Sequence, residues 1–166
     1  MKHPHSLARQ TGSVLIISLI MLLLLTLAAT TSMQVTSLEE RMAGNMRNRN
    51  LAFQAAESAL RAGENILTQA ALPNFTNAGD NGLYAQDGAP PGAYDAWPNN
   101  NTAEVSGAIG QVAVAPRYVI QRMANVESGA SLDAGEYGQS EMYRVTARGV
   151  GGTETAVVVL QSTYKR

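Results

Sequence analysis

Few side chains in this sequence could do nucleophilic, acid–base or metal chemistry, and their positions argue against an enzyme. The chain has no cysteine, which excludes thiol catalysis and thiolate ligation of a metal. Its two histidines are His3 and His5. If a short leader is removed, no imidazole remains, so a Ser-His-Asp triad and a histidine-ligated zinc site are also excluded. We therefore expect no catalytic residue.

Clusters of acids are the remaining candidates for chemistry. One cluster falls between expected strands, at Glu127, Asp133, Glu136 and Glu141. It lacks a nucleophile, a cofactor motif and a histidine, so we interpret it as solvated loop acids rather than a general acid/base pair. Asp80, Asn81 and Asp87 lack the spacing of an EF-hand and are better explained by turn chemistry. No metal and no cofactor is expected.

The charge of the chain gives little support for nucleic-acid binding. The formal net charge is −1. Arg41, Arg47 and Arg49 are clustered, but Glu39 and Glu40 lie beside them, whereas nucleic acid needs a basic face. DNA contact is the weaker interpretation, and we expect no nucleic-acid partner.

One apolar stretch, residues 11–38, dominates the sequence. No charge occurs between Arg9 and Glu39, and residues 14–29 include eleven Leu, Ile or Val. At roughly −0.3 to −0.6 kcal/mol each, they favour membrane insertion by about 3 to 6 kcal/mol. A helix from Ser13 to about Met33 is long enough to span once. Lys2 and Arg9 precede it, which predicts a cytoplasmic N-terminus and a head in the periplasm.

The residues before this stretch indicate how the chain is processed. A secretory signal would be cut after its apolar run, but Ala28, Ala29 and Thr30 are a poor site. The short basic leader ending in Gly12, followed by Ser13 and the apolar run, resembles a type IV prepilin. The resemblance implies cleavage between Gly12 and Ser13 and N-methylation of Ser13 by a prepilin peptidase. It also implies that the hydrophobic helix packs with neighbouring subunits.

One position departs from the prepilin pattern. Members of that family usually carry Glu at the fifth residue after cleavage, and this chain has Ile17. In the family this Glu is thought to pair with the N-terminal amine of a neighbouring subunit. A subunit with Ile17 seeks no such neighbour, which suits one that starts the fibre or lies at its tip. The alternative is that Ile17 marks a looser family member. The residues assigned to the assembly helix are Val14, Ile17, Leu22 and Leu25.

Helical signals continue beyond the membrane segment. No proline occurs between His5 and Pro73, so one helix from Ser13 to about Ala70 would be roughly 85 Å long. Apolar residues at spacings of three, four and seven predict the helix face that packs on the head: Met42, Met46, Phe53, Leu60 and Leu67. Glu57 and Arg61 form a favourable i,i+4 pair. Any local unwinding is expected at residues 26–34, with an uninterrupted helix as the alternative.

Residues 38–64, LEERMAGNMRNRNLAFQAAESALRAGE, narrow the resemblance. They are similar to the N-terminal domain of PilX-type minor pilins, and the similarity extends over residues 10–67. YRVTARGVGG and VVVLQSTYKR, near the end, are similar to the C-terminal end of the same proteins. A charged amphipathic stalk is the alternative for residues 38–64. The expected domains are a leader at 1–12, the transmembrane half of the helix at 13–37 and the head at 38–166.

Within the head, residues 71–116 are expected to form an irregular loop. Between Pro73 and Pro116, 20 of 44 residues are Gly, Pro, Asn or Asp. Four aromatic residues are expected to pin this loop to a sheet, or alternatively to bind a partner: Phe75, Tyr84, Tyr94 and Trp97. Strands are predicted at 117–123, 142–148 and 155–164, with a further one conceivable at 111–115. They form a small antiparallel sheet against the 38–70 part of the helix.

These features predict an α+β, type IV pilin-like fold. The resemblance implies a minor pilin that primes pilus assembly, is positioned at the fibre tip, and supports twitching motility and attachment. Its implied partners are other minor pilins, the major pilin, the prepilin peptidase and the inner-membrane assembly machinery. The implied location is the inner membrane, then the fibre at the cell surface. The alternatives are a tip-type pseudopilin of type II secretion and a single-pass anchor for a periplasmic binding domain.

Overall fold

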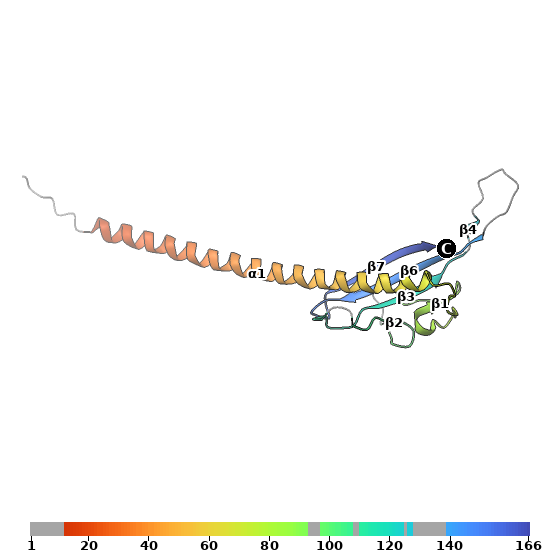
Figure 1. Ribbon diagram of the computed structural model, residues 1–166. Helices are drawn as coiled ribbons and strands as arrows, with labels where there is room; N and C mark the ends of the chain where they lie inside the picture. Colours follow the sequence, from red (N-terminus) through yellow and green to blue (C-terminus); the bar gives the residue numbers. More distant parts are fainter. Residues whose placement is uncertain (1–11, 93–96, 108–109, 125, 128–138) are drawn as a thin grey trace, which may run out of the picture. The chain divides into compact units, whose positions relative to one another are not determined.

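A computed structural model describes residues 12–92, 97–107, 110–124, 126–127 and 139–166 (Figure 1). The chain divides into two compact units, Met1–Gly44 and Asn45–Arg166. A single helix, α1 (Ser13–Leu67), contributes to both units. It ends three residues before the expected end at Ala70, where Thr68 donates a hydrogen bond from its hydroxyl to the carbonyl oxygen of Asn65, 2.8 Å away. No unwinding occurs at residues 26–34, so the uninterrupted helix is the correct alternative.

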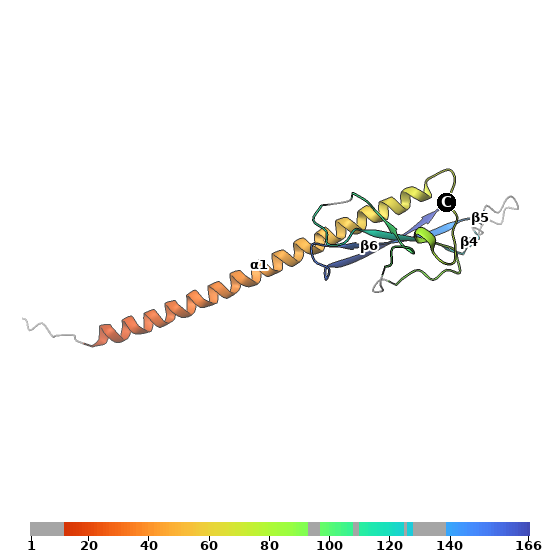
Figure 2. The ribbon, with the colours of Figure 1, turned by 90° about the horizontal axis from the view of Figure 1, so that it is seen from below.

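The second unit contains three long antiparallel strands. β3 (Arg117–Arg122) pairs with β6 (Met142–Val150), and β6 pairs with β7 (Val157–Lys165). All three were expected from alternation and β-formers, with bounds that differ by one or two residues. A glycine-containing turn joins β6 to β7, and the Gly151 N–H donates to the Ala156 carbonyl across it at 2.8 Å. Both views show the C-terminal part of α1 running along this sheet (Figures 1 and 2).

Short elements from the loop extend the sheet on the far side of β3. After η1 (Asp80–Gly82), β1 (Leu83–Tyr84) pairs with β3 in parallel, and β2 (Ala103–Glu104) pairs with β3 in antiparallel orientation. The sheet is therefore mixed rather than wholly antiparallel. A separate ribbon is made by β4 (Val126–Glu127) and β5 (Gln139–Ser140). Residues 111–115 form no strand: Gln111 has a φ of 86°, outside the extended region, and the chain bends at residues 113–114.

Small residues hold the helix against the sheet. Ala52, Ala55, Ala56 and Ala59 have no exposed surface, and Gly63 is also buried. Their spacing of three and four residues places them on one helix face. Because these side chains are short, the backbone of α1 comes close to the backbone of β6. A Cβ on Gly149 of β6 would lie 2.2 Å from the Ala52 carbonyl oxygen and 2.3 Å from the Ala56 nitrogen.

The buried alanines show that the predicted packing face of the helix was partly wrong. Of the five residues assigned to it, Leu67 is buried and Leu60 packs against the core. Phe53 is 47% exposed and Met46 69%, so neither is buried in the head. Met42 lies in the first unit, where its side chain is 63% exposed. Opposite Ala52 and Ala56 the sheet backbone lies too close to α1 for large side chains. The alanine stripe takes their place.

The loop aromatics hold the loop on the sheet, as expected. Phe75 packs on Tyr143 with ring centroids 5.5 Å apart. Tyr84 and Trp97 form a second buried cluster with Val119 on the sheet face opposite α1. The Tyr84 hydroxyl donates to the Asn101 carbonyl at 3.1 Å, and the Trp97 indole N–H to the Gly92 carbonyl at 3.0 Å. Tyr94 lies outside the described residues.

Candidate assembly site

The expected processing site coincides with the start of the helix. Gly12 is a bend with a φ of +138°, and Ser13 is the first residue of α1. A Cβ at Gly12 would meet nothing within 4 Å, so a side chain is disfavoured by the backbone conformation and not by crowding. Gly12 therefore leaves the Gly12–Ser13 peptide bond just before the first helical turn.

The residues assigned to the assembly helix present a continuous apolar surface. Val14, Ile17, Leu22 and Leu25 are between 56% and 69% exposed in the single chain. In the part of the chain that the structure describes, α1 is the one helix long and apolar enough to cross a membrane, judged by length and composition. An exposed surface of this kind needs lipid or other helices to cover it.

Five hydroxyls in this half of α1 donate hydrogen bonds within the helix. Each of several hydroxyls donates to a carbonyl three or four residues earlier: Ser18 to Leu15, Thr26 to Leu23, Thr30 to Leu27, Thr31 to Leu27 and Ala28, and Thr36 to Ser32. A hydroxyl bonded in this way can face hydrocarbon without losing its hydrogen bond. The threonines are thus compatible with a membrane environment, and they do not interrupt the helix.

Glu141, one of the acids considered for chemistry, has a structural role in the head. Glu141 accepts hydrogen bonds from Arg122 at 2.7 Å and from the Tyr143 hydroxyl at 2.6 Å. Burial, this hydrogen bond and the charge of Glu141 raise the pKa of Tyr143 to about 12. Burial also raises the pKa of Tyr118. A tyrosine with a raised pKa stays neutral near pH 7, so it neither gives up nor takes up a proton there. Its role is to pack in the core.

Two of the residues considered for a metal, Asp80 and Asn81, lie in one turn, and Asp87 lies in the next turn. Thr76 donates from its hydroxyl to the Asp80 carboxylate at 3.0 Å, and the same hydroxyl accepts from the Asp80 N–H at 3.2 Å. Asn81 adopts a left-handed conformation with φ 54°, which asparagine tolerates. Among the described residues, no three His, Cys, Asp or Glu side chains lie together as metal ligands. Asp133, Glu136 and the side chain of Glu127 lie outside the described part.

Sequence reasoning missed one ion pair, in which the arginine is buried and the glutamate is partly exposed. Arg117 donates to the Glu104 carboxylate at 2.6 Å and to the Thr102 hydroxyl at 3.0 Å, and its side chain is 9% exposed. The pair joins β3 to β2 and fastens the end of the loop to the sheet. No local pattern predicts it, because Glu104 and Arg117 lie 13 residues apart in a segment with no periodicity.

A long apolar N-terminal helix, whose C-terminal part packs on a small mixed sheet, defines a pilin-like α+β protein. Two family models match this chain: PilX N-terminal over residues 11–61 and Type IV pilus assembly protein PilX C-term over residues 65–166. The chain belongs to the PilX family. No curated protein and no solved structure gives a match. The protein is thus a minor pilin-type component of the type IV pilus, anchored by its apolar helix, and it functions with other pilus components.

Proposed function

We propose that this chain is a priming subunit at the tip of the type IV pilus. It is cleaved at Gly12–Ser13, N-methylated, and held in the inner membrane with its head in the periplasm until it enters the fibre. It assembles with other minor pilins and then with the major pilin, and it contributes indirectly to twitching motility and attachment. Its partners before assembly are the prepilin peptidase and the inner-membrane assembly machinery.

The observation that carries this proposal is the uncharged first half of α1. Residues 13–38 have no ionisable side chain, and Ile17 takes the place of the prepilin glutamate. A charged residue at mid-membrane costs about 2.5 to 3.5 kcal/mol on insertion scales unless it finds a partner. This subunit has no such need for an earlier neighbour, while the amine at Ser13 remains available to the glutamate of a subunit that follows. An asymmetry of this kind suits the first position in a fibre.

The first test is the N-terminal sequence and intact mass of the membrane-extracted chain, from cells with and without prepilin peptidase. The proposal expects a chain that begins at N-methylated Ser13 only when the peptidase is present. A chain that keeps its leader in both strains would be a plain membrane anchor. One that begins beyond Ala28 would be a secreted domain, and either result overturns the proposal.

A second set of measurements distinguishes a subunit at the pilus tip from one in the shaft and from a pseudopilin of type II secretion. Deletion of the gene should reduce the number of surface pili several-fold while the rate of type II secretion is unchanged. Quantitative mass spectrometry of sheared pili should find a few copies of the chain per fibre, independent of fibre length. A copy number that grows with fibre length would place the chain in the shaft.

A further inference from the structure

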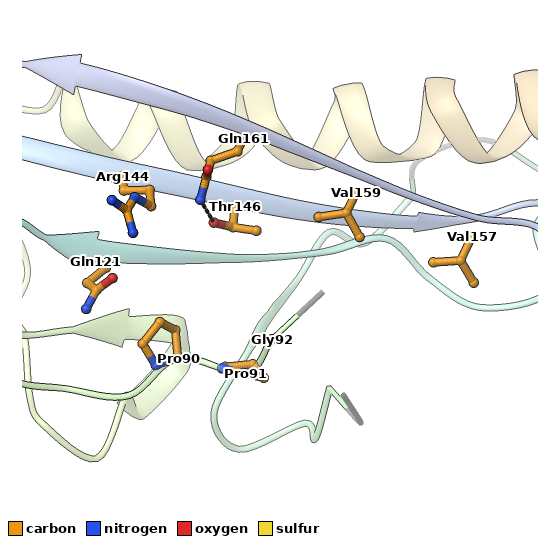
Figure 3. Close-up of a pocket in the computed structure, with 9 residues that line it drawn as sticks. All are labelled: Pro90, Pro91, Gly92, Gln121, Arg144, Thr146, Val157, Val159 and Gln161. Atoms are coloured by element: carbon orange, nitrogen blue, oxygen red, sulfur yellow. Dashed lines mark hydrogen bonds between the residues drawn. The ribbon is translucent and has the colours of Figure 1, made fainter. Parts of the chain in front are cut away.

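The sheet face opposite α1 contains a hollow that the assembly role does not use. It has a volume of about 580 Å³ and lies between the loop residues Pro90 and Pro91 and strands β3, β6 and β7 (Figure 3). Arg144 and Gln161 line its polar end, and Val157 and Val159 line its apolar end. The hollow thus offers one cation beside an apolar floor.

Most polar groups around the hollow are already paired, but Arg144 is not. Gln121 donates to the Gly88 carbonyl at 3.0 Å, and Gln161 donates to the Thr146 hydroxyl at 3.1 Å. Among the described residues, the Arg144 guanidinium makes no ion pair and no hydrogen bond, and Figure 3 shows it at the hollow without a dashed line. A guanidinium presents five N–H donors and binds carboxylates in a bidentate manner.

The surrounding sheet face adds positive charge. Alternation along β6 places Arg148 on the same face as Arg144, and its buried Nε has no hydrogen-bond partner in the structure. Arg117, opposite Arg148 on β3, is neutralised by Glu104. Within the described residues, this face therefore carries two guanidiniums without a carboxylate. A partly buried, unpaired donor of this kind favours an anionic ligand that restores its hydrogen bonds.

The edge of the sheet shows what kind of ligand fits. β7 is the last strand of its sheet. Hydrogen bonds from Gly151 to Ala156 and from Arg166 to Glu141 show that the even-numbered residues of β7 face β6. The backbone N–H and C=O groups of Val157, Val159 and Gln161 therefore point outward, along an edge that no other described strand covers. The side chains of these same three residues line the hollow, so a peptide strand pairing here would lie beside it.

We propose that this hollow is a docking site for an extended, acidic peptide segment of another pilus subunit. The segment pairs with the outer edge of β7 and places an Asp or Glu carboxylate on the Arg144 guanidinium. An apolar side chain two residues away, on the same face of the segment, covers Val157 and Val159. The identity of the partner as a pilus subunit rests on the proposed function, whereas the carboxylate site rests on the hollow and its charges alone.

Photocrosslinking in piliated cells tests this proposal on the full-length chain. A photoreactive phenylalanine replaces Val157, which is 38% exposed at the rim of the hollow. The expected adduct joins position 157 to a segment of another pilus protein that contains Asp or Glu. Arg144→Gln should lower its yield at least fivefold. Arg61→Gln, which neutralises an exposed arginine on α1, is the matched control and should leave the yield unchanged.

A charge exchange makes the test specific. Arg144→Glu should abolish the adduct, and replacement of the crosslinked acid by Lys in the partner should restore it. Trp97 fluorescence of each purified variant shows whether the head is folded. An adduct that is insensitive to Arg144→Gln, an adduct to lipid, a segment without an acid, or no adduct would each overturn the proposal.

The N-terminus of the same samples is determined in parallel. Normal processing at Ser13 without an Arg144-dependent adduct overturns the docking site alone. Absence of processing overturns the pilus role, and an Arg144-dependent adduct to an acidic segment would then retain the carboxylate site with a different partner.

Discussion

At the scale of single residues, the head depends on a few positions where no larger side chain fits. Gly149 is one of them, because β6 crosses the helix backbone there with Ala52 and Ala56 directly opposite. Gly149 has no left-handed φ, so its backbone conformation does not require glycine. The close approach of the two backbones does. The alanines and this glycine together set the separation of helix and sheet.

Gly149→Ala should therefore destabilise the head strongly. The added Cβ would lie 2.2 Å from a backbone oxygen of α1, so a strand or helix must move, and overpacking of this kind costs about 1 to 3 kcal/mol or more. Thermal unfolding of the detergent-solubilised chain, followed by the fluorescence of Trp97, measures the loss. Gly110→Ala is the control, because a Cβ there meets nothing within 4 Å. Equal melting temperatures for the two variants would contradict the close approach.

The raised pKa of Tyr143 predicts how stability depends on alkaline pH. In the unfolded chain the phenol ionises near its ordinary pKa of 10.0, whereas in the folded chain its pKa is about 12. Between these values the unfolded state has lost a proton that the folded state retains, so stability falls as pH rises. Below pH 10 this contribution is fully present.

Tyr143→Phe should thus be less stable than the wild type near pH 8, by about 1 kcal/mol for the lost hydrogen bond to Glu141. The difference should shrink between pH 10 and 12, because the variant has no phenol to ionise at this position. Urea unfolding monitored by circular dichroism at several pH values measures both effects. Parallel pH profiles for variant and wild type would show that Tyr143 is not the responsible group.

At the scale of elements, the face of α1 that packs on the sheet has alanines in place of large side chains. Ala56→Leu should lower the free energy of unfolding of the head by about 1 to 3 kcal/mol or more, because the buried alanine leaves no room for a larger side chain. Phe53→Ala, three residues earlier, should cost less than about 1 kcal/mol, since Phe53 is 47% exposed. The urea concentration at which a protease begins to cleave each variant ranks the stability of the two. The reverse ranking would restore the large apolar residues as the packing face.

The same contrast shows what the sequence could and could not predict. The helix, β6 and β7 follow from local signals: an unbroken run without proline, and alternation in which Tyr143, Val145 and Ala147 share a buried face. The wrong helix face came from the rule that large apolar residues lie inside, and that rule fails where backbones approach closely. The parallel pairing of β1 is non-local, since Leu83 and Ile120 lie far apart in the sequence.

The candidate site divides in the same way. Gly12, Ser13 and the apolar residues after them could be proposed as a site from the sequence, because their signal is contiguous. The hollow at Arg144 could not, because a loop and three strands must first be brought together to form it. Single charges such as Arg144 look solvated in a sequence, and only the fold shows which of them lack a partner.

At the scale of the whole molecule, the first half of α1 and the head have separate tasks. The apolar half supplies a surface that lipid or neighbouring helices cover, and the hydroxyls of Thr26 and Thr30 are satisfied within the helix. The head supplies the polar surfaces of the described chain, among them the loop and the sheet face opposite α1. Position 17 belongs to the first task, and a change there should alter assembly while it leaves the head folded.

Ile17→Glu is the sharpest test of a role in priming. The new carboxylate lies among exposed apolar residues of α1, where it costs about 2.5 to 3.5 kcal/mol in a membrane unless an N-terminal amine neutralises it. At the first position of a fibre no earlier subunit supplies that amine. Pili per cell should therefore fall several-fold, with processing at Ser13 and Trp97 fluorescence unchanged. Ile17→Gln, which is polar but uncharged, should have a smaller effect, and a fully piliated Ile17→Glu strain would show that the missing acid has no role in starting the fibre.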